Sequence, residues 1–385
     1  MQIYEMKNPI KNYAWGSKSF FSNLLGDKQS SQPQAELWMG THPLGVSEIK
    51  YDNEWISLEK LIYFNPETVL GEKLASKLDN RLPFLFKILA IEKPLSIQVH
   101  PDEHQAIQGF ERENKRNISL SASNRNFKDK SHKPELVCAL TPLWAMCGFR
   151  SYTTIQTHFS VISDKVKLCQ SDQTIYYFFK QLMNLDNNQK NQLIASAVQY
   201  AQSRADQIHW QWVTRLASQF PEDIGVLAPL FLNLICLNPG ESLFLQPGVL
   251  HAYLDGNAVE IMCNSDNVIR GGLTVKHIDI ETLLNIVLPH SQDLNPIHPQ
   301  MRKDNEWHYP IPIDRFTLTR YDVQPDHILN MTVNGPEIVL CVHGKIRIHQ
   351  NTDSLYLRPG RSAFVCYEAH SYTVDGDGVV YKAGV

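Results

Sequence analysis

The stretch Pro239-Gly-Glu-Ser-Leu-Phe-Leu-Gln-Pro-Gly-Val-Leu-His251 decides the fold that the sequence predicts. Its two Pro-Gly pairs are typical of turns, and the apolar run between them is typical of a short strand. His251 then opens the next strand directly after a turn. Such a turn fixes the direction of the imidazole, as a metal ligand requires. The stretch therefore predicts β structure with a candidate ligand at a turn.

A second stretch, Gly360-Arg-Ser-Ala-Phe-Val-Cys-Tyr-Glu-Ala-His370-Ser-Tyr372, resembles the segment from Gly240 to Tyr253. Both contain G-x-S-x-F, then a His after a short turn, then a Tyr two residues later. A repeat of this kind in a β-rich chain predicts two related barrels or sandwiches.

The rest of the chain divides by its pattern of apolar residues. Short β-type runs occupy residues 1–150 and return from 231, whereas residues 151–230 show helical spacing. The first motif also resembles the second motif of the cupin barrels in the spacing of its glycines and its His. We therefore expect a mainly β chain, with two cupin-type jelly-roll barrels or sandwiches and an inserted α-helical region.

The expected domains follow from this division. Residues 1–150 and 231–290 should form a catalytic cupin region with the metal site, because His251 must return to the earlier strands. Residues 151–230 should be a helical insertion. Residues 291–385 should form a degenerate cupin-like β domain without metal. The polar stretch 111–130 predicts a solvated loop.

Composition excludes several classes of protein. The 385 residues are 43% hydrophobic and 20% charged, as in globular proteins, and the net charge of −4 argues against a nucleic-acid partner. No apolar run approaches membrane-spanning length, so we expect no membrane partner. The seven cysteines are scattered without a C-x-x-C pair, which predicts reduced thiols and a cytoplasmic location.

Four side chains form a candidate metal site. In Leu95-Ser-Ile-Gln-Val-His-Pro-Asp102, Gln98 and His100 project from one face of a strand, because strand side chains alternate. Glu135 starts another strand and adds a carboxylate, and His251 adds a second imidazole. Two nitrogens, two oxygens and one negative charge would leave a metal ion with room for water, which is a catalytic arrangement.

These ligands alone leave alternatives open. Two His and one carboxylate on a cupin scaffold also suit an Fe(II) oxygenase, although Gln98 would fill a position that oxygen chemistry needs. A non-catalytic sugar-binding cupin is another reading. The chain contains no G-x-x-x-x-G-K-[ST] loop, which disfavours nucleotide hydrolysis.

Several further motifs, in order along the chain, carry a resemblance to a known family. They are Tyr13-Ala-Trp-Gly-Ser17, Ala35-Glu-Leu-Trp-Met-Gly-Thr-His-Pro43, Leu82-Pro-Phe-Leu-Phe-Lys-Ile-Leu-Ala90, Leu95 to Asp102, His132-Lys-Pro-Glu135, Cys147-Gly-Phe-Arg150, and Val259-Glu-Ile-Met-Cys-Asn-Ser-Asp-Asn-Val-Ile-Arg270-Gly-Gly-Leu-Thr-Val-Lys276. With them the chain resembles the type I mannose-6-phosphate isomerases. One departure is Leu245-Gln-Pro-Gly248, where the family commonly has Leu-Pro-Ala-Gly.

The resemblance implies a zinc-dependent isomerase that interconverts mannose 6-phosphate and fructose 6-phosphate through a cis-enediol or enediolate. It implies one Zn²⁺ per chain and the function of a carbohydrate-metabolism enzyme, in mannose catabolism or in supply for GDP-mannose. We expect the protein to be a monomer. The residues that it assigns are as follows: Gln98, His100, Glu135 and His251 as metal ligands; Arg270, Glu260 and Lys133 as catalytic residues; and Ser96, Lys87 and Lys276 as substrate-binding residues.

Overall fold

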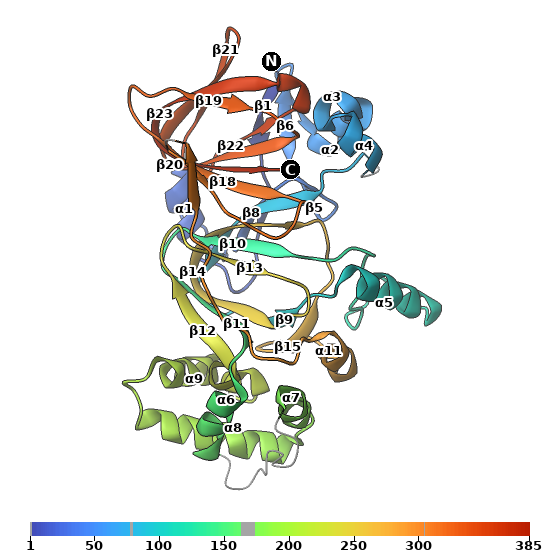
Figure 1. Ribbon diagram of the computed structural model, residues 1–385, viewed down its shortest axis with the longest axis vertical. Coiled ribbons are helices and arrows are strands. Elements are labelled where there is room, and N and C mark those ends of the chain that lie inside the picture. The colour runs from blue at the N-terminus through green and yellow to red at the C-terminus, as the bar shows by residue number, and fades with distance from the viewer. Residues whose placement is uncertain (1, 78–79, 163–173, 304) are drawn as a thin grey trace.

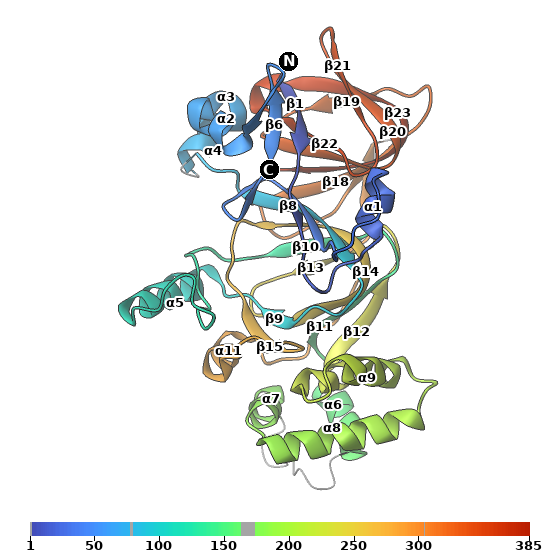
Figure 2. The same ribbon diagram turned by 180° about the vertical axis from the view of Figure 1, so that it is seen from behind.

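The computed structural model describes residues 2–77, 80–162, 174–303 and 305–385. Figure 1 shows three tiers along the long axis: a sheet that contains the C-terminal strands, a second sheet in the middle, and a group of helices at the far end. The view from behind shows the same order, and both termini lie in the first tier (Figure 2).

The middle tier is built on a ten-stranded sheet that combines strands from both sides of the helical segment. Strand β14 connects much of this sheet, because it pairs with β8, β9, β10 and β11. Its strands are β2 (Ile10–Lys11), β3 (Glu36–Met39), β8 (Phe84–Ile91), β9 (Ile97–Val99), β10 (Glu135–Ala139), β11 (Leu143–Phe149), β12 (Leu232–Leu237), β13 (Ser242–Leu245), β14 (His251–Cys263) and β15 (Ile269–Gly272).

The first tier is an eleven-stranded sheet that combines C-terminal and N-terminal strands. Its strands are β1 (Ile3–Lys7), β6 (Glu48–Tyr51), β7 (Glu54–Ser57), β16 (Gln300–Lys303), β17 (Glu306–His308), β18 (Thr317–Val323), β19 (Leu329–Thr332), β20 (Glu337–Gln350), β21 (Asp353–Leu357), β22 (Ser362–Val365) and β23 (Ser371–Gly384). A small pair, β4 (Thr41–His42) with β5 (Gly45–Val46), lies outside both sheets.

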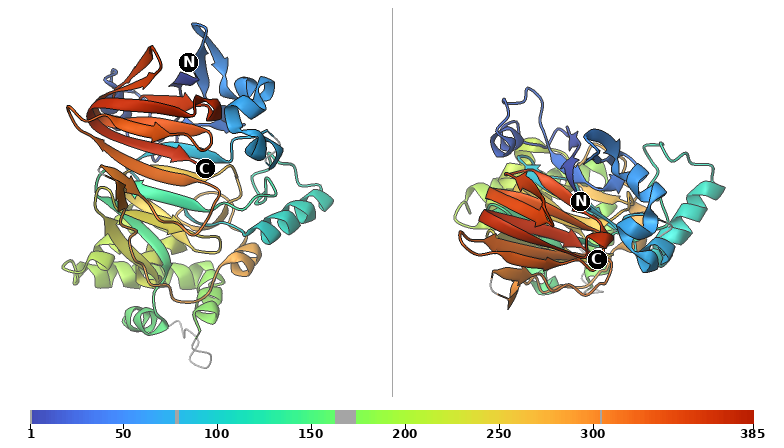
Figure 3. Two further views of the ribbon diagram at one scale, coloured as in Figure 1. Left: turned by 45° about the horizontal axis from the view of Figure 1, so that its top comes forward. Right: turned by 90° about the horizontal axis from the view of Figure 1, so that it is seen from above.

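The N-terminal strands differ from the expected division of the chain. β1 pairs with β22 and β6, so the first segment links the C-terminal sheet to the rest of the molecule. Figure 3 shows these strands beside the C-terminal sheet. The domain limits at residues 150, 231 and 291 remain a proposal, and this pairing shows that residues 1–150 do not belong wholly to the ten-stranded sheet.

The predicted repeat corresponds to a repeated structure. Gly240 and Gly360 both have a positive φ, and each precedes a four-residue strand, β13 or β22. Each of these is followed by a long strand, β14 or β23, whose Gly256 or Gly376 has φ near 120°. A Cβ at Gly256 would meet the carbonyl of Pro142 just before β11, and one at Gly376 would meet the carbonyl of Lys345 in β20, so only glycine fits.

The largest group of helices lies between β11 and β12, as the spacing of apolar residues predicts. The helical segments are α1 (Phe20–Leu25), α2 (Leu58–Phe64), α3 (Pro66–Leu70), α4 (Glu72–Lys77), α5 (Glu103–Lys115), α6 (Tyr152–Ser160), α7 (Ile175–Met183), α8 (Asn187–Gln202), α9 (Ile208–Gln219), η1 (Ile224–Leu227), α10 (Ala228–Phe231), α11 (Ile280–Ile286) and η2 (Tyr367–Ala369). Residues 163–173 of the predicted insertion lie outside the described residues. No described helix combines the length and the apolar character that a membrane crossing requires.

The insertion packs against the outer face of the ten-stranded sheet. Ile97 and Val99 of β9 join a large apolar cluster with side chains of α6 to α10, whereas Gln98 between them points to the opposite face. This alternation is the one that the Gln-x-His motif predicts. The mainly β fold class, with two sandwich-like cupin units and a helical insertion, is confirmed.

The prediction of a solvated loop over residues 111–130 was wrong in part. Helix α5 continues to Lys115 and begins at an Asp102 capping box, and residues 125–127 are buried. The Arg125 guanidinium lies 2.9 Å from the Glu113 carboxylate and donates to backbone carbonyls, which allows a polar segment to pack inside. Composition alone could not reveal this pairing.

Candidate metal centre

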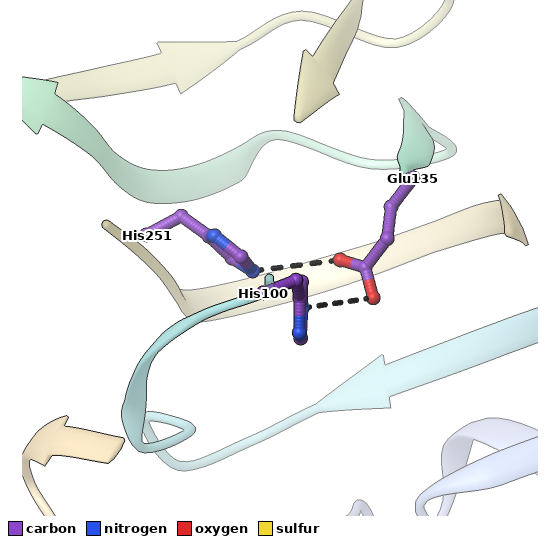
Figure 4. A group of neighbouring side chains, drawn as sticks. All are labelled: His100, Glu135 and His251. Atoms are coloured by element: carbon purple, nitrogen blue, oxygen red, sulfur yellow. Dashed lines mark ion pairs between the residues drawn. The ribbon is translucent and has the colours of Figure 1, made fainter. Parts of the chain in front are cut away.

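Three side chains from separate strands converge on one buried point (Figure 4). His100 follows β9, Glu135 begins β10 and His251 begins β14. Each is at most 2% exposed, and one ligand atom of each lies within 4.8 Å of the others. His100 Nε2 lies 3.3 Å from Glu135 Oε1, and His251 Nε2 lies 3.4 Å from Glu135 Oε2. The structure therefore brings together three of the four predicted ligands.

The donor atoms of this group fit a metal ion. Within the described part of the chain, His100 Nε2, His251 Nε2 and Glu135 Oε2 are buried without a hydrogen-bond partner. Buried polar atoms are seldom left without a partner, so three of them at one point indicate a site for a bound ion. Both imidazoles donate from Nδ1 to a backbone carbonyl, His100 to Asn267 at 2.7 Å and His251 to Val249 at 2.9 Å. These bonds orient both rings so that each Nε2 points toward Glu135.

The protonation states of these side chains also favour the binding of a metal cation. Burial would raise the pKa of Glu135, but Lys133 and His100 outweigh burial and hold that pKa well below its usual range. Burial, with Lys133 nearby, lowers the pKa of His100 to about 4. The carboxylate is therefore ionised and the imidazole of His100 is neutral at neutral pH, which are the forms that bind metal.

Gln98 lies beside the group through the strand register. It is opposite His251 on one side and opposite Arg270 on the other. The turn before His251 keeps its spacing, because Gly248 has φ 82° and its N–H donates to the carbonyl of His100. The altered Gln-Pro-Gly sequence therefore still holds the two imidazoles next to each other. Gln98 stays a proposed ligand.

A second buried polar group lies next to the metal ligands. Lys87 on β8 is opposite Glu260 on β14 and opposite Trp38 on β3. Its ammonium lies 3.0 Å from Glu260 and 3.7 Å from Glu36. The other oxygen of Glu260 accepts a hydrogen bond from the Tyr253 hydroxyl at 3.0 Å. These contacts form a continuous buried row across three strands.

The charge state of this row follows from its partners. Burial would lower the pKa of Lys87, but Glu260 and Glu36 outweigh burial and raise it, so the ammonium form persists. Burial raises the pKa of Glu260, while Lys87 opposes the shift and Glu135 adds to it. A buried carboxyl with a raised pKa is suited to proton transfer.

Arg270, one of the predicted cations, is opposite Gln98 in the strand register, and Lys276 follows it six residues later. Arg270 on β15 is half-buried, and burial lowers its pKa. Lys276 lies in the exposed turn after β15, where partial desolvation by its neighbours, together with the charge of Arg270, lowers its pKa. Neither pairs with a carboxylate among the residues that the structure describes. Ser96 is half-buried just before β9. Unpaired cations suit an anionic group on a substrate.

Two members of the buried row were absent from the prediction. Glu36 is only 8% exposed and shares a strand face with Trp38, whose indole N–H donates to it. An acidic residue inside an apolar strand was a signal of this, because such a carboxylate needs a partner. Tyr253 is 2% exposed, and its place two residues after His251 in the repeat was the other signal.

Comparison with known proteins gives a consistent family assignment. Residues 3–152 match the model described as phosphomannose isomerase type I, catalytic domain. Residues 153–232 match the helical insertion domain of the same family, and residues 305–382 match the mannose-6-phosphate isomerase cupin domain. The three matches together span most of the chain.

Relatives match along the whole length. The mannose-6-phosphate isomerase of Escherichia coli is 38% identical over 98% of both chains. The human mannose-6-phosphate isomerase is 32% identical over 90% of this chain and 88% of its own. A Salmonella typhimurium mannose 6-phosphate isomerase structure, described as bound to substrate and to a zinc atom, superposes with a TM-score of 0.93 at 35% identity. It covers 100% of this chain and 99% of that one. With its fold, its buried His-Glu-His group and these matches, the chain belongs to the type I phosphomannose isomerase family of enzymes.

Proposed function

We propose that the protein is a zinc-dependent aldose–ketose isomerase that interconverts mannose 6-phosphate and fructose 6-phosphate. The observation that carries this proposal is the buried group of His100, Glu135 and His251, whose three ligand atoms have no hydrogen-bond partner among the described residues. Relatives of this chain bear that enzyme name, and one was solved with substrate and zinc. Gln98 completes the proposed ligand set, with one ion per chain.

The ligand set suits zinc by its chemistry. Two imidazoles and one carboxylate are a common catalytic zinc set, and such sites leave a position for water or substrate. A bound zinc ion would act as a Lewis acid toward the sugar oxygens near the reacting carbons. The readings as an Fe(II) oxygenase or as a binding protein lack any supporting relative among those described above.

The reaction moves a proton between C1 and C2 of the sugar. We assign this transfer to Glu260, because burial raises the pKa of its carboxyl and Tyr253 and Lys87 hold it in place. Lys133 lies 2.9 Å from Glu135 and is the neighbouring group that can exchange protons with the sugar hydroxyls. Arg270 stabilises the enediolate, because a guanidinium keeps its charge at working pH.

Substrate binding is assigned to the cations and to a hydroxyl group. Lys276 and Ser96 bind the phosphate, with Lys87 directed at the sugar oxygens. All six cysteines among the described residues are free, which supports a reducing, cytoplasmic setting. We further propose that the protein acts as a monomer.

A coupled assay tests the proposal directly. Purified protein, depleted of metal with a chelator and reloaded with zinc or iron, is given mannose 6-phosphate, and the formation of fructose 6-phosphate is followed. We expect turnover only with the metal-loaded protein, and metal analysis to find one zinc per chain. No turnover by the zinc-loaded protein would contradict the proposal. Full turnover by the His100→Ala or Arg270→Ala variant would contradict the site assignment alone.

A further inference from the structure

Asn267 connects the loop between β14 and β15 to the metal ligand His100. The residue is completely buried. Its backbone carbonyl accepts the hydrogen bond from His100 Nδ1 at 2.7 Å. Since that bond fixes the tautomer and the rotation of the ring, the position of this carbonyl determines where Nε2 points.

The side chain of the same residue holds a second loop. Asn267 Oδ1 accepts hydrogen bonds from the backbone N–H groups of Lys128 at 2.7 Å and Asp129 at 3.2 Å. Its Nδ2 group donates to the backbone carbonyls of Asp129 and Ser131, both at 2.9 Å, and to the Asp129 carboxylate at 3.2 Å. Both ends of the amide are therefore used, as donor and as acceptor.

The two loops are joined from the other side as well. The Asp129 carboxylate accepts hydrogen bonds from the Ser265 hydroxyl at 2.9 Å and from the backbone N–H of Asp266 at 2.8 Å. Four residues after the clamped Ser131, the chain reaches the ligand Glu135. The loop that fixes His100 is thus tied to the segment that delivers the carboxylate.

We infer that Asn267 is a positioning residue for the metal centre, which sets the placement of His100 relative to Glu135. The inference rests on the proposed function only through the zinc site. An amide is required, because a carboxylate at this position could accept from the two N–H groups but would face the oxygens of Asp129 and Ser131 without a proton to donate. Repulsion would then separate the two loops, and with them His100, which is bonded to one loop, from Glu135, which follows the other.

The test compares Asn267→Asp with the unchanged protein in zinc binding. Metal-free protein is titrated with zinc against a chromophoric chelator, and with cobalt while its visible absorption spectrum is recorded. We expect roughly 10- to 100-fold weaker zinc binding in Asn267→Asp, since outer partners of metal-bound histidines have effects of this size. The cobalt spectrum should change with it, because the geometry of the ligands changes.

The matched control is Asn264→Asp, the same substitution three residues earlier. Asn264 donates to the carbonyl of Leu82 at 3.1 Å, and among the described residues no hydrogen bond joins its side chain to His100 or to residues 128–131. We expect zinc affinity within about twofold of the unchanged protein. If Asn267→Asp lowers only the melting temperature and keeps the zinc affinity and the cobalt spectrum, the inference is overturned.

A second substitution covers the case in which Asn267→Asp does not fold. Asn267→Ser keeps a small donor, and the same two titrations apply to it, with unchanged zinc affinity again overturning the inference. If the unchanged protein binds no zinc, the proposed metal centre itself is contradicted. That result is distinguishable, because it appears before any variant is compared.

Discussion

The ammonium group of Lys87 lies 3.0 Å from Glu260 and 3.7 Å from Glu36, and all three side chains are buried. One cation therefore neutralises two carboxylates beside the metal ligands. Removing it would leave both carboxylates buried without a cation, which costs more than removing either acid.

We expect Lys87→Met to lower the free energy of unfolding by about 3–5 kcal/mol and to abolish turnover. Glu260→Gln keeps the shape of the side chain and should destabilise the protein less, while still reducing turnover. Urea unfolding and the coupled assay measure both effects. Lys93→Met changes an exposed lysine in the turn directly after β8 and serves as the control. A Lys87→Met protein as stable as this control would show that the carboxylates are not charged.

The hydroxyl of Tyr253 should matter for activity, because it holds the oxygen of Glu260 that Lys87 does not contact. We expect Tyr253→Phe to cost about 1–3 kcal/mol of stability, since it leaves a buried acceptor without a donor, and to lower kcat.

The repeat supplies a matched control for this substitution. Tyr372 donates to the buried Glu337 at 2.9 Å, and Lys382 lies 2.8 Å from the same carboxylate. Tyr372→Phe should therefore cost a similar amount of stability but leave kcat unchanged. Equal losses of kcat in the two variants, measured well below their melting temperatures, would argue against a specific role of Tyr253.

Acid should destabilise the metal-free protein through His100. Its pKa is about 4 in the folded chain and near 6.5 in the unfolded chain, so between these values the unfolded state binds more protons. Stability from this group is complete above about pH 6.5 and is lost as the pH falls toward 4. At pH 5 the loss is about 2 kcal/mol. Urea unfolding at pH 7.5 and pH 5 checks this, and His100→Gln should show a correspondingly smaller difference.

Zinc should stabilise the folded chain, because its ligands meet only after folding. At a free zinc concentration 1,000 times the dissociation constant, the expected gain is about 4 kcal/mol. Calorimetric melting with zinc and with chelator measures it, and Glu135→Gln should reduce the difference. Identical melting curves for the unchanged protein would exclude a bound ion at this centre.

Lys276→Met should weaken substrate binding without stopping the chemistry, because the side chain is exposed. We expect KM for mannose 6-phosphate to rise roughly five- to tenfold, about 1 kcal/mol, with kcat nearly unchanged. Lys276→Arg keeps the charge and should restore most of the affinity. A similar KM in Lys276→Met and the unchanged protein would remove Lys276 from the phosphate site.

The sequence by itself determined the features that depend on local spacing. Alternation along a strand placed Gln98 on the face opposite to Ile97 and Val99, and the Pro-Gly turn placed His251 at the start of a strand. Glycines at 240 and 360 marked the repeat because the turns need a positive φ. Such features are set within a few residues, so the pattern alone predicts them.

Only the tertiary structure decided which distant strands pair and which polar groups meet. Three contacts join segments that are far apart in the chain. They are the pairing of β1 with β22, the ion pair of Lys87 with Glu36, and the hydrogen bond from His100 to the carbonyl of Asn267. Burial is also a property of the whole fold. Only the fold shows that the ligand atoms of the His-Glu-His group are buried and have no hydrogen-bond partner among the described residues. The physical reason is that spacing acts along the chain, whereas desolvation and register depend on everything packed around a residue.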